Sequence, residues 1–175
     1  MGKLFGSSGV RGLANVDLTP LLSCKVGLAV SAYAKAHRAI VARDTRVSGS
    51  MIEDALVSSL MASGSDVYLA DVVPTPVLAY ATRALSADVG FMITASHNPK
   101  EYNGFKFATG FSETMLTEDI QNFRKLAQSG QFVARLPIGE IFRKDIKDEY
   151  IKDIFRRVDR IGKFKVVVDA CSATA

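Results

Sequence analysis

The apolar residues of this chain follow two patterns, short continuous runs and longer segments with helical spacing, and the two patterns alternate along the chain. Short runs rich in apolar and β-branched residues are typical of buried strands. Such runs cover residues 39–42, 67–70, 88–94, 105–107 and 164–169. Between most of them lie longer segments whose apolar residues recur every three or four positions, for example from Leu21 to Tyr33, which predicts helices that bury one face.

Local residues mark where the predicted helices begin and end. Thr19 before Pro20 is typical of an N-cap followed by proline at the first helical position. Ser50 with Glu53 three residues later predicts a capping box, and Gly64 predicts the end of that helix. Further helices are expected to begin at 74–76, to begin with Thr117 as N-cap, and to run over 145–157.

Strands that alternate with helices through short connections predict an α/β fold, here a three-layer α/β/α domain with a mostly parallel mixed sheet. The run over 164–169 is different, because no helical segment follows it. We therefore expect residues 1–157 to form one domain. Residues 158–175 are expected to be a linker and the first strand of a second, similar domain in a longer polypeptide.

Composition and charge narrow the classes of function. Hydrophobic residues make up 48% of the 175 residues and the net charge is only +4, without a single basic tract. No apolar run reaches the roughly eighteen residues that a membrane span needs. Cys24 and Cys171 fit neither a disulfide framework nor a metal motif. These features predict a cytoplasmic protein that binds neither nucleic acid nor membranes.

A glycine-rich segment opens the chain. Residues 5–12 read FGSSGVRG, with glycines in a G-x-x-G-x-x-G spacing that differs from the dinucleotide-binding fingerprint. Glycine permits close backbone approach, and Arg11 can form a paired hydrogen bond to phosphate. The segment by itself fits either a phosphate-binding loop or an ordinary glycine-rich turn.

Two further loops follow predicted strands. Residues 42–49 read ARDTRVSG, in which Arg43 and Arg46 flank Asp44 shortly before a helix start that also favours anions. The alternative for these charges is an ordinary surface ion pair. The Pro-Thr-Pro segment at 74–76 is expected to be mainly structural, since its prolines shape the loop and begin a helix.

The loop after the run at 88–94 carries the sharpest chemical pattern. Ser96 stands at the end of an apolar strand, next to His97 and ten residues before Lys106. A serine hydroxyl needs a base or a positive environment to act as a nucleophile, and both neighbours are candidates. A hydrolase elbow requires glycine two residues before and two after the serine, but these positions hold Thr94 and Asn98. The local motif therefore excludes that class.

Taken together, the four loops resemble those of the α-D-phosphohexomutase superfamily, which includes the phosphoglucomutases and phosphomannomutases. The segments that carry the resemblance occur in the family's order and at about its spacing: FGSSGVRG at 5–12, ARDTRVSG at 42–49, PTP at 74–76, TASHNP at 94–99 and NGFK at 103–106. The match runs from residue 2 to about 170 and corresponds to the first of the family's four domains plus the first strand of the second.

The resemblance implies a phosphoserine enzyme. In the family, the serine that Ser96 matches is phosphorylated at rest and gives its phosphoryl group to a hexose monophosphate. The hexose 1,6-bisphosphate that forms, which also serves as activator, returns its other phosphate to the serine. Mg²⁺ contacts the phosphoserine, so Ser96 is the expected metal contact. The remaining metal ligands belong to an aspartate-rich loop of the second domain, which this sequence lacks.

The resemblance also assigns roles to neighbouring residues. Lys106 matches the family's general acid/base, with plain electrostatic stabilisation as the alternative, and Arg11 matches an arginine that stabilises charge near the phosphoserine. His97 is expected to shape the loop or to bond to the phosphoserine. The residues expected to bind phosphate are Ser7, Arg11, Arg43 and Arg46. For Arg43 and Arg46, organising the site through Asp44 is the favoured alternative.

The substrate expected from the resemblance is a phosphorylated hexose. Thr94 stands where bacterial aminosugar mutases usually carry serine, which favours mannose or glucose phosphate. After Asp169 the chain reads ACSATA instead of the family's Asn-Gly-Ala-Gly segment, and the sugar-recognising domains are absent, so this chain is expected to be inactive alone. The alternatives are a stand-alone domain that binds phosphosugars without catalysis and a non-functional fragment. The sequence predicts no oligomeric state.

Overall fold

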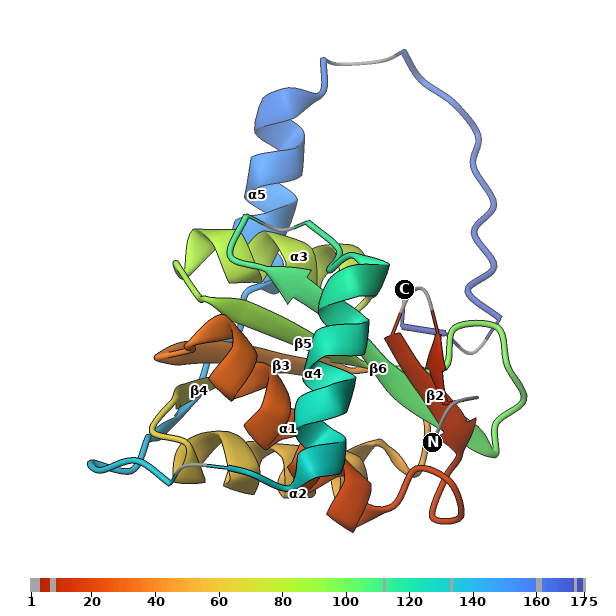
Figure 1. Ribbon diagram of the computed structural model, residues 1–175. Helices are drawn as coiled ribbons and strands as arrows, with labels where there is room; N and C mark the ends of the chain where they lie inside the picture. Colours follow the sequence, from red (N-terminus) through yellow and green to blue (C-terminus); the bar gives the residue numbers. More distant parts are fainter. Residues whose placement is uncertain are drawn as a thin grey trace.

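A mixed seven-stranded sheet forms the centre of the fold in the computed structural model, which describes residues 4–6, 9–111, 113–132, 134–159, 162–171 and 173–174 (Figure 1). Its strands lie in the order β1-β2-β6-β5-β3-β4-β7. Their bounds are β1 Phe5–Gly6, β2 Gly9–Leu13, β3 Arg38–Arg43, β4 Asp66–Val72, β5 Val89–Ile93, β6 Tyr102–Thr109 and β7 Ile141–Arg143.

Strand directions bring several loops to one edge of this sheet. β3 pairs in parallel with β4 and β5, and β4 pairs in parallel with β7. β6 is antiparallel to both β5 and β2, and β1 forms a hairpin with β2. In the described part of the chain, β1 and β6 therefore run against the other strands. The expected mixed sheet is confirmed, with three parallel and three antiparallel pairings among the described strands, and the carboxyl ends of β3, β4 and β5 meet at one edge.

Helices cover both faces of the sheet, as expected for a three-layer fold. Their bounds are α1 Pro20–Ala34, α2 Gly49–Ala62, α3 Thr75–Ala84, α4 Thr117–Ser129 and α5 Lys147–Arg157. Figure 1 shows α1 and α2 on the side of the sheet opposite to α3 and α5. Helices α1, α2 and α4 contribute to one apolar cluster, while α3 contributes to a second, against which Tyr150 of α5 packs.

The central strands explain why apolar runs were visible in the sequence. In β3, Ala39 and Val41 belong to one apolar cluster, whereas Ile40 and Ala42 belong to the other. A strand that is buried on both faces shows a continuous apolar run instead of alternation. None of the described helices is both long and apolar enough to cross a bilayer.

The helix starts confirm one predicted cap. The Thr19 hydroxyl accepts a hydrogen bond from the Leu22 backbone N–H at 3.2 Å, and Pro20 is the first helical residue. At the end of α2, Gly64 has a left-handed φ of 81°, which fits its predicted role after the helix.

Two predicted caps are wrong. The N-cap of α2 is Ser48, so Ser50 lies inside the first turn, and the Glu53 carboxylate accepts a hydrogen bond from Arg43 instead of returning to the helix start. Thr117 is the first residue of α4, and Leu116 precedes it as N-cap. There the Asp119 carboxylate accepts the Leu116 N–H at 2.9 Å, so an aspartate inside the helix supplies the cap.

The segment over 164–169 is not paired as a strand in the described part of the chain, and its assignment to the start of a second domain stays a prediction. These residues form no ladder with any described strand, and the side chains of Phe164 and Val167 are 73% and 93% exposed. A strand needs a neighbour to accept its backbone hydrogen bonds, and no described strand pairs with this segment. By contrast, β7 and the β1–β2 hairpin were not predicted, because their short sequences carry no apolar run.

Two adjacent leucines of α1 test the packing of the larger apolar cluster. Leu22 is 4% exposed and Leu21 is 67% exposed. Leu22→Ala should lower the free energy of unfolding by about 2–5 kcal/mol, because it leaves a cavity in the core. Leu21→Ala is the matched control and should change it by less than about 0.5 kcal/mol. Urea denaturation measures both, and equal effects would contradict the packing described.

Candidate active site

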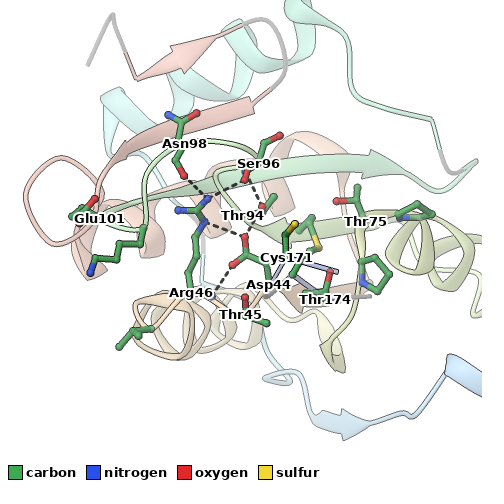
Figure 2. Close-up of a pocket in the computed structure, with 16 residues that line it drawn as sticks. Asp44, Thr45, Arg46, Thr75, Thr94, Ser96, Asn98, Glu101, Cys171 and Thr174 are labelled. Atoms are coloured by element: carbon green, nitrogen blue, oxygen red, sulfur yellow. Dashed lines mark hydrogen bonds and ion pairs between the residues drawn. The ribbon is translucent and has the colours of Figure 1, made fainter. Parts of the chain in front are cut away.

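A cavity of about 900 Å³ lies at the edge of the sheet where the parallel strands end (Figure 2). Residues 44–47 after β3, 74–76 after β4 and several residues of the 94–101 loop after β5 line it. Cys171, Ala173 and Thr174 of the C-terminal segment line it as well. In open α/β sheets, ligands bind outside the carboxyl ends of the strands, so the position suits a functional site.

Ser96 lies at this cavity in an unusual backbone conformation. Its φ of 58° is in the left-handed region, which residues other than glycine rarely adopt. The side chain is exposed, and its Oγ lies 3.3 Å from Nδ1 of His97, which is exposed too. Backbone strain of this kind persists where the surroundings enforce it, often at functional sites. The structure therefore presents Ser96 at the cavity and brings His97 beside it.

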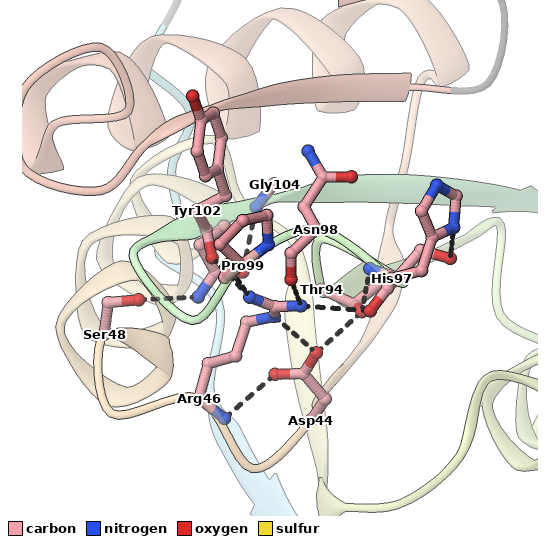
Figure 3. Close-up of polar contacts among 11 residues, drawn as sticks. Asp44, Arg46, Ser48, Thr94, His97, Asn98, Pro99, Tyr102 and Gly104 are labelled. Carbon is pink, nitrogen blue, oxygen red and sulfur yellow. Dashed lines mark hydrogen bonds and ion pairs between the residues drawn. The ribbon is translucent and has the colours of Figure 1, made fainter. Parts of the chain in front are cut away.

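The Arg46 guanidinium holds the loop that contains Ser96 (Figure 3). Its Nη1 donates to the carbonyl oxygens of Pro99 at 2.6 Å and Tyr102 at 2.9 Å. Its Nη2 donates to the carbonyl oxygens of Ser96 at 3.0 Å and Asn98 at 2.8 Å. A guanidinium has five N–H groups, and these four bonds leave only Nε.

The last donor of Arg46 completes an ion pair with Asp44. Nε lies 3.1 Å from Asp44 Oδ2, and the two side chains are 11% and 16% exposed. Every guanidinium N–H of Arg46 is thus used inside the protein. The expected phosphate contact by Arg46 has no free donor, and the alternative role, organising the site with Asp44, is the one that the geometry supports.

Arg43 makes a different ion pair on the other side of the loop. Its Nε lies 3.0 Å from Oε2 of Glu53, while Oε1 of Glu53 is buried without a hydrogen-bond partner. Burial raises the pKa of Glu53, and the hydrogen bond from Arg43 opposes that rise. Arg43 does not line the cavity, and its expected phosphate contact stays a prediction.

Arg11 and Lys106 extend from neighbouring strands on one face of the sheet. Arg11 in β2 stands opposite Gly104 in β6, and Lys106 stands opposite Met92 in β5, which lines the cavity. The residues between these positions, such as Phe105, face the opposite side of the sheet and belong to the larger apolar cluster. Among the described residues, neither cationic side chain has a hydrogen bond or ion pair at its charged end. Ser7 lies outside the described residues.

A metal site is not formed by the described residues. They contain no group of three or more His, Cys, Asp or Glu side chains placed to hold an ion. Two acidic side chains of this region are also engaged in ion pairs, since Asp44 binds Arg46 and Glu53 binds Arg43. The Ser96 hydroxyl would be a single ligand, which does not make a magnesium site.

Sequence reasoning missed two features of this region. One is the task of Thr94, whose hydroxyl donates to Asp44 Oδ2 at 2.7 Å and accepts the N–H of Ser96 at 3.0 Å. A threonine two residues before a serine in a loop is a weak signal for such a contact. The other is the approach of Cys171 and Thr174 to the cavity, for which the sequence offered no signal.

Comparison with known proteins gives consistent results. The family described as "Phosphoglucomutase/phosphomannomutase, alpha/beta/alpha domain I" matches residues 2–133. A protein of Pyrococcus furiosus named "Probable phosphoglucosamine mutase" is 40% identical over 172 residues, which cover 97% of this chain and 38% of that protein. A "Phosphoglucomutase/phosphomannomutase" of Thermococcus kodakarensis is 42% identical over 166 residues, covering 91% of this chain and 36% of that protein.

A solved structure shows the same fold. The crystal structure of a phosphoglucomutase/phosphomannomutase family protein from Burkholderia thailandensis superposes with a TM-score of 0.80 at 28% identity. The superposition covers 88% of this chain and 35% of that chain. This chain therefore spans somewhat more than a third of the length of the proteins that it matches.

The Arg46 contacts can be tested by their effect on stability. Arg46→Ala should lower the free energy of unfolding by about 3–5 kcal/mol, because it leaves the Asp44 carboxylate without its cation and the four carbonyl oxygens without their guanidinium donor. Arg46→Lys keeps the charge but has three donors for five acceptors, so it should also be destabilised. Urea denaturation measures both variants.

The control for Arg46 is Arg143, whose ion pair with Asp71 lies at the surface with side chains 73% and 55% exposed. Arg143→Ala should change the free energy of unfolding by less than about 1 kcal/mol. If Arg46→Lys were as stable as the wild type, the bonds to the loop carbonyls would not carry the stability assigned to them.

Proposed function

This chain belongs to the phosphoglucomutase/phosphomannomutase family, and we propose that it is the phosphoserine-bearing part of a phosphohexomutase. Such an enzyme interconverts hexose 1-phosphate and hexose 6-phosphate. The observation that carries the proposal is the setting of Ser96. Its hydroxyl is exposed at the edge cavity, and the backbone around it is held in a left-handed conformation by Arg46. A fixed, accessible hydroxyl is what an alignment-dependent phosphoryl transfer requires.

The proposed reaction uses Ser96 as a phosphoryl carrier. Its Oγ attacks one phosphorus of hexose 1,6-bisphosphate: the new P–O bond forms to serine, the serine hydroxyl gives up its proton, the bond to the sugar oxygen breaks, and that oxygen takes up a proton. In the next half-reaction a sugar hydroxyl attacks the phosphorus of the phosphoserine and loses its proton, the bond from phosphorus to Oγ breaks, Oγ takes up a proton, and the bisphosphate is regenerated. The phosphate moves between the two ends of the sugar, and the bisphosphate acts as activator because it phosphorylates the resting serine.

Three neighbouring residues are proposed to assist this transfer. Lys106 is the proposed acid/base toward the sugar oxygen, since it stands opposite Met92, which lines the cavity. Arg11 on the same face is proposed to stabilise charge on the phosphoryl oxygens. His97, at 3.3 Å from Ser96 Oγ, is proposed to hydrogen-bond to the phosphoserine. Arg43 and Ser7 are proposed as further phosphate contacts.

We propose that the remaining magnesium ligands and the sugar-recognising residues belong to other parts of a longer protein. The described residues form no metal site, and the chain spans 38% of the Pyrococcus relative's length. Exposed apolar side chains at Phe164, Val166 and Val168 support the proposal that residues 158–175 are a linker and the start of a second domain after a first domain at 1–157. A cytoplasmic location stays a prediction.

The proposed substrate is first a class, the phosphorylated hexoses, and then a narrower choice among particular sugars. A phosphorylated hexose is supported by relatives named as mutases of glucosamine, glucose and mannose phosphates. The narrower expectation of mannose or glucose rested on Thr94, whose hydroxyl is used by Asp44 and Ser96 and is only 5% exposed as a residue. The Thr94 hydroxyl is thus already hydrogen-bonded within the protein, and glucosamine phosphate is to be assayed beside glucose and mannose phosphate.

Phosphorylation of Ser96 tests the proposal directly. The full protein should take up one phosphoryl group from hexose 1,6-bisphosphate, and a phosphopeptide map by mass spectrometry should place it on Ser96. Ser96→Ala should abolish both this uptake and turnover. Ser58→Ala is the matched control, because the Ser58 side chain is exposed on α2 and its hydroxyl bonds only to the helix backbone at Asp54.

Two results would contradict the proposal. Uptake by Ser96→Ala, or retained turnover in that variant, would exclude Ser96 as the carrier. Binding of hexose phosphate by the full wild-type protein without phosphorylation or turnover would favour the alternative of a phosphosugar-binding protein without catalysis.

Two substitutions of Lys106 distinguish proton transfer by its amine from electrostatic stabilisation by its charge. Lys106→Ala should lower kcat by about a hundredfold or more in the full protein if the amine transfers the proton. Lys106→Arg keeps the charge but cannot release a proton near neutral pH, so it should be nearly as slow. Steady-state kinetics measures both, and a near-normal rate for the arginine variant would leave Lys106 only an electrostatic role.

A further inference from the structure

The backbone of Ser96 is fixed on both sides by side chains from outside its own turn. Its carbonyl oxygen accepts a hydrogen bond from Arg46 Nη2 at 3.0 Å, and its N–H donates to the Thr94 hydroxyl at 3.0 Å. These two groups belong to the peptide planes before and after the Ser96 Cα. Holding both planes determines φ and ψ of Ser96, and with them the direction in which Oγ leaves the backbone.

The direction of each hydrogen bond at Thr94 follows from its partners. The Asp44 carboxylate, paired with Arg46, can only accept, so the Thr94 O–H donates to Asp44 Oδ2 at 2.7 Å. The lone pairs of the same oxygen then face the Ser96 N–H. The short distance is typical of a hydrogen bond to a charged acceptor, which is stronger than a neutral one. Thr94 thus links the buried ion pair to the backbone of the serine.

Thr94 itself has little freedom to move. It is 5% exposed, and its own backbone N–H donates to the Gly104 carbonyl on β6 at 2.9 Å. The next residue along the chain toward the serine, Ala95, is fully buried. The hydroxyl is therefore presented from a rigid position at the end of β5, not from a mobile loop.

We propose that Thr94 is a positioning residue for phosphoryl transfer, whose hydroxyl keeps Ser96 in its left-handed conformation and so aims Oγ at the phosphoryl donor. The proposal rests on the proposed function of Ser96 as the phosphoryl carrier. It also means that the Ser96 N–H is occupied by Thr94. Other groups, such as Arg11 and Lys106, must then stabilise the charge on the phosphoryl group, because this amide already donates to Thr94.

Three variants of the full protein test this role. Thr94→Val has nearly the same shape but no hydroxyl, whereas Thr94→Ser keeps the hydroxyl and loses a methyl group. Thr82→Val is the matched control, because Thr82 is fully buried and its hydroxyl bonds to the Leu78 carbonyl inside α3, away from the serine loop. Each variant is assayed for kcat and KM, and hydrogen exchange by mass spectrometry follows the Ser96 amide.

The expected result is a loss in Thr94→Val that the other two variants do not share. Its kcat should fall by about tenfold to a hundredfold through misalignment of Oγ, while KM stays within about twofold. Its Ser96 amide should exchange at least about tenfold faster, since its acceptor is gone. Thr94→Ser and Thr82→Val should keep wild-type amide protection, and their kcat should stay within about threefold of the wild type.

The two readouts keep this proposal separable from the proposed function. Unchanged Ser96 exchange in Thr94→Val, or an unchanged kcat in an active protein, would overturn the role of Thr94 while leaving Ser96 as the carrier. If the wild type itself showed no phosphorylation or turnover, the proposed function would fail, and the catalytic role of Thr94 with it. The exchange data would then still decide whether its hydroxyl holds the Ser96 backbone.

Discussion

The serine loop depends on one largely buried cation, the guanidinium of Arg46. A loop without regular secondary structure has backbone carbonyl groups that must find donors if they are removed from water. Four such carbonyl oxygens, from residues 96, 98, 99 and 102, converge on the guanidinium of Arg46, whose charge is balanced by Asp44. One side chain therefore replaces the hydrogen-bond ladder that a strand or helix would provide, and it gives the loop a single conformation.

This cation can act only because the sheet places two strand ends side by side. β3 and β5 are parallel neighbours, and the register pairs Arg43 with Ile93 at their carboxyl ends. The Asp44 N–H continues the pairing by donating to the Ile93 carbonyl at 3.0 Å. The loop with the ion pair and the loop with the serine thus leave the sheet together. Their closeness follows from apolar packing on both faces of these strands.

The sequence and the structure agree where a pattern has a local cause. Strands buried on both faces produced apolar runs, and Thr19 before Pro20 produced a confirmed cap, since both signals reflect forces acting within a few residues. Predictions failed where a distant group competed. Glu53, for example, accepts a hydrogen bond from Arg43 at the end of β3 instead of capping α2.

The sequence by itself determined the α/β fold class, the positions of the central strands and the candidate chemistry of Ser96, because these are written in residue type and short-range spacing. Only the tertiary structure decided what Arg46 and Thr94 do. The carbonyl acceptors of Arg46 lie 50 to 56 residues away along the chain, and the Asp44 acceptor of Thr94 lies 50 residues away. Hydrogen bonds act over about 3 Å. Which groups come that close is settled by strand order and register, and these come from packing of the whole domain.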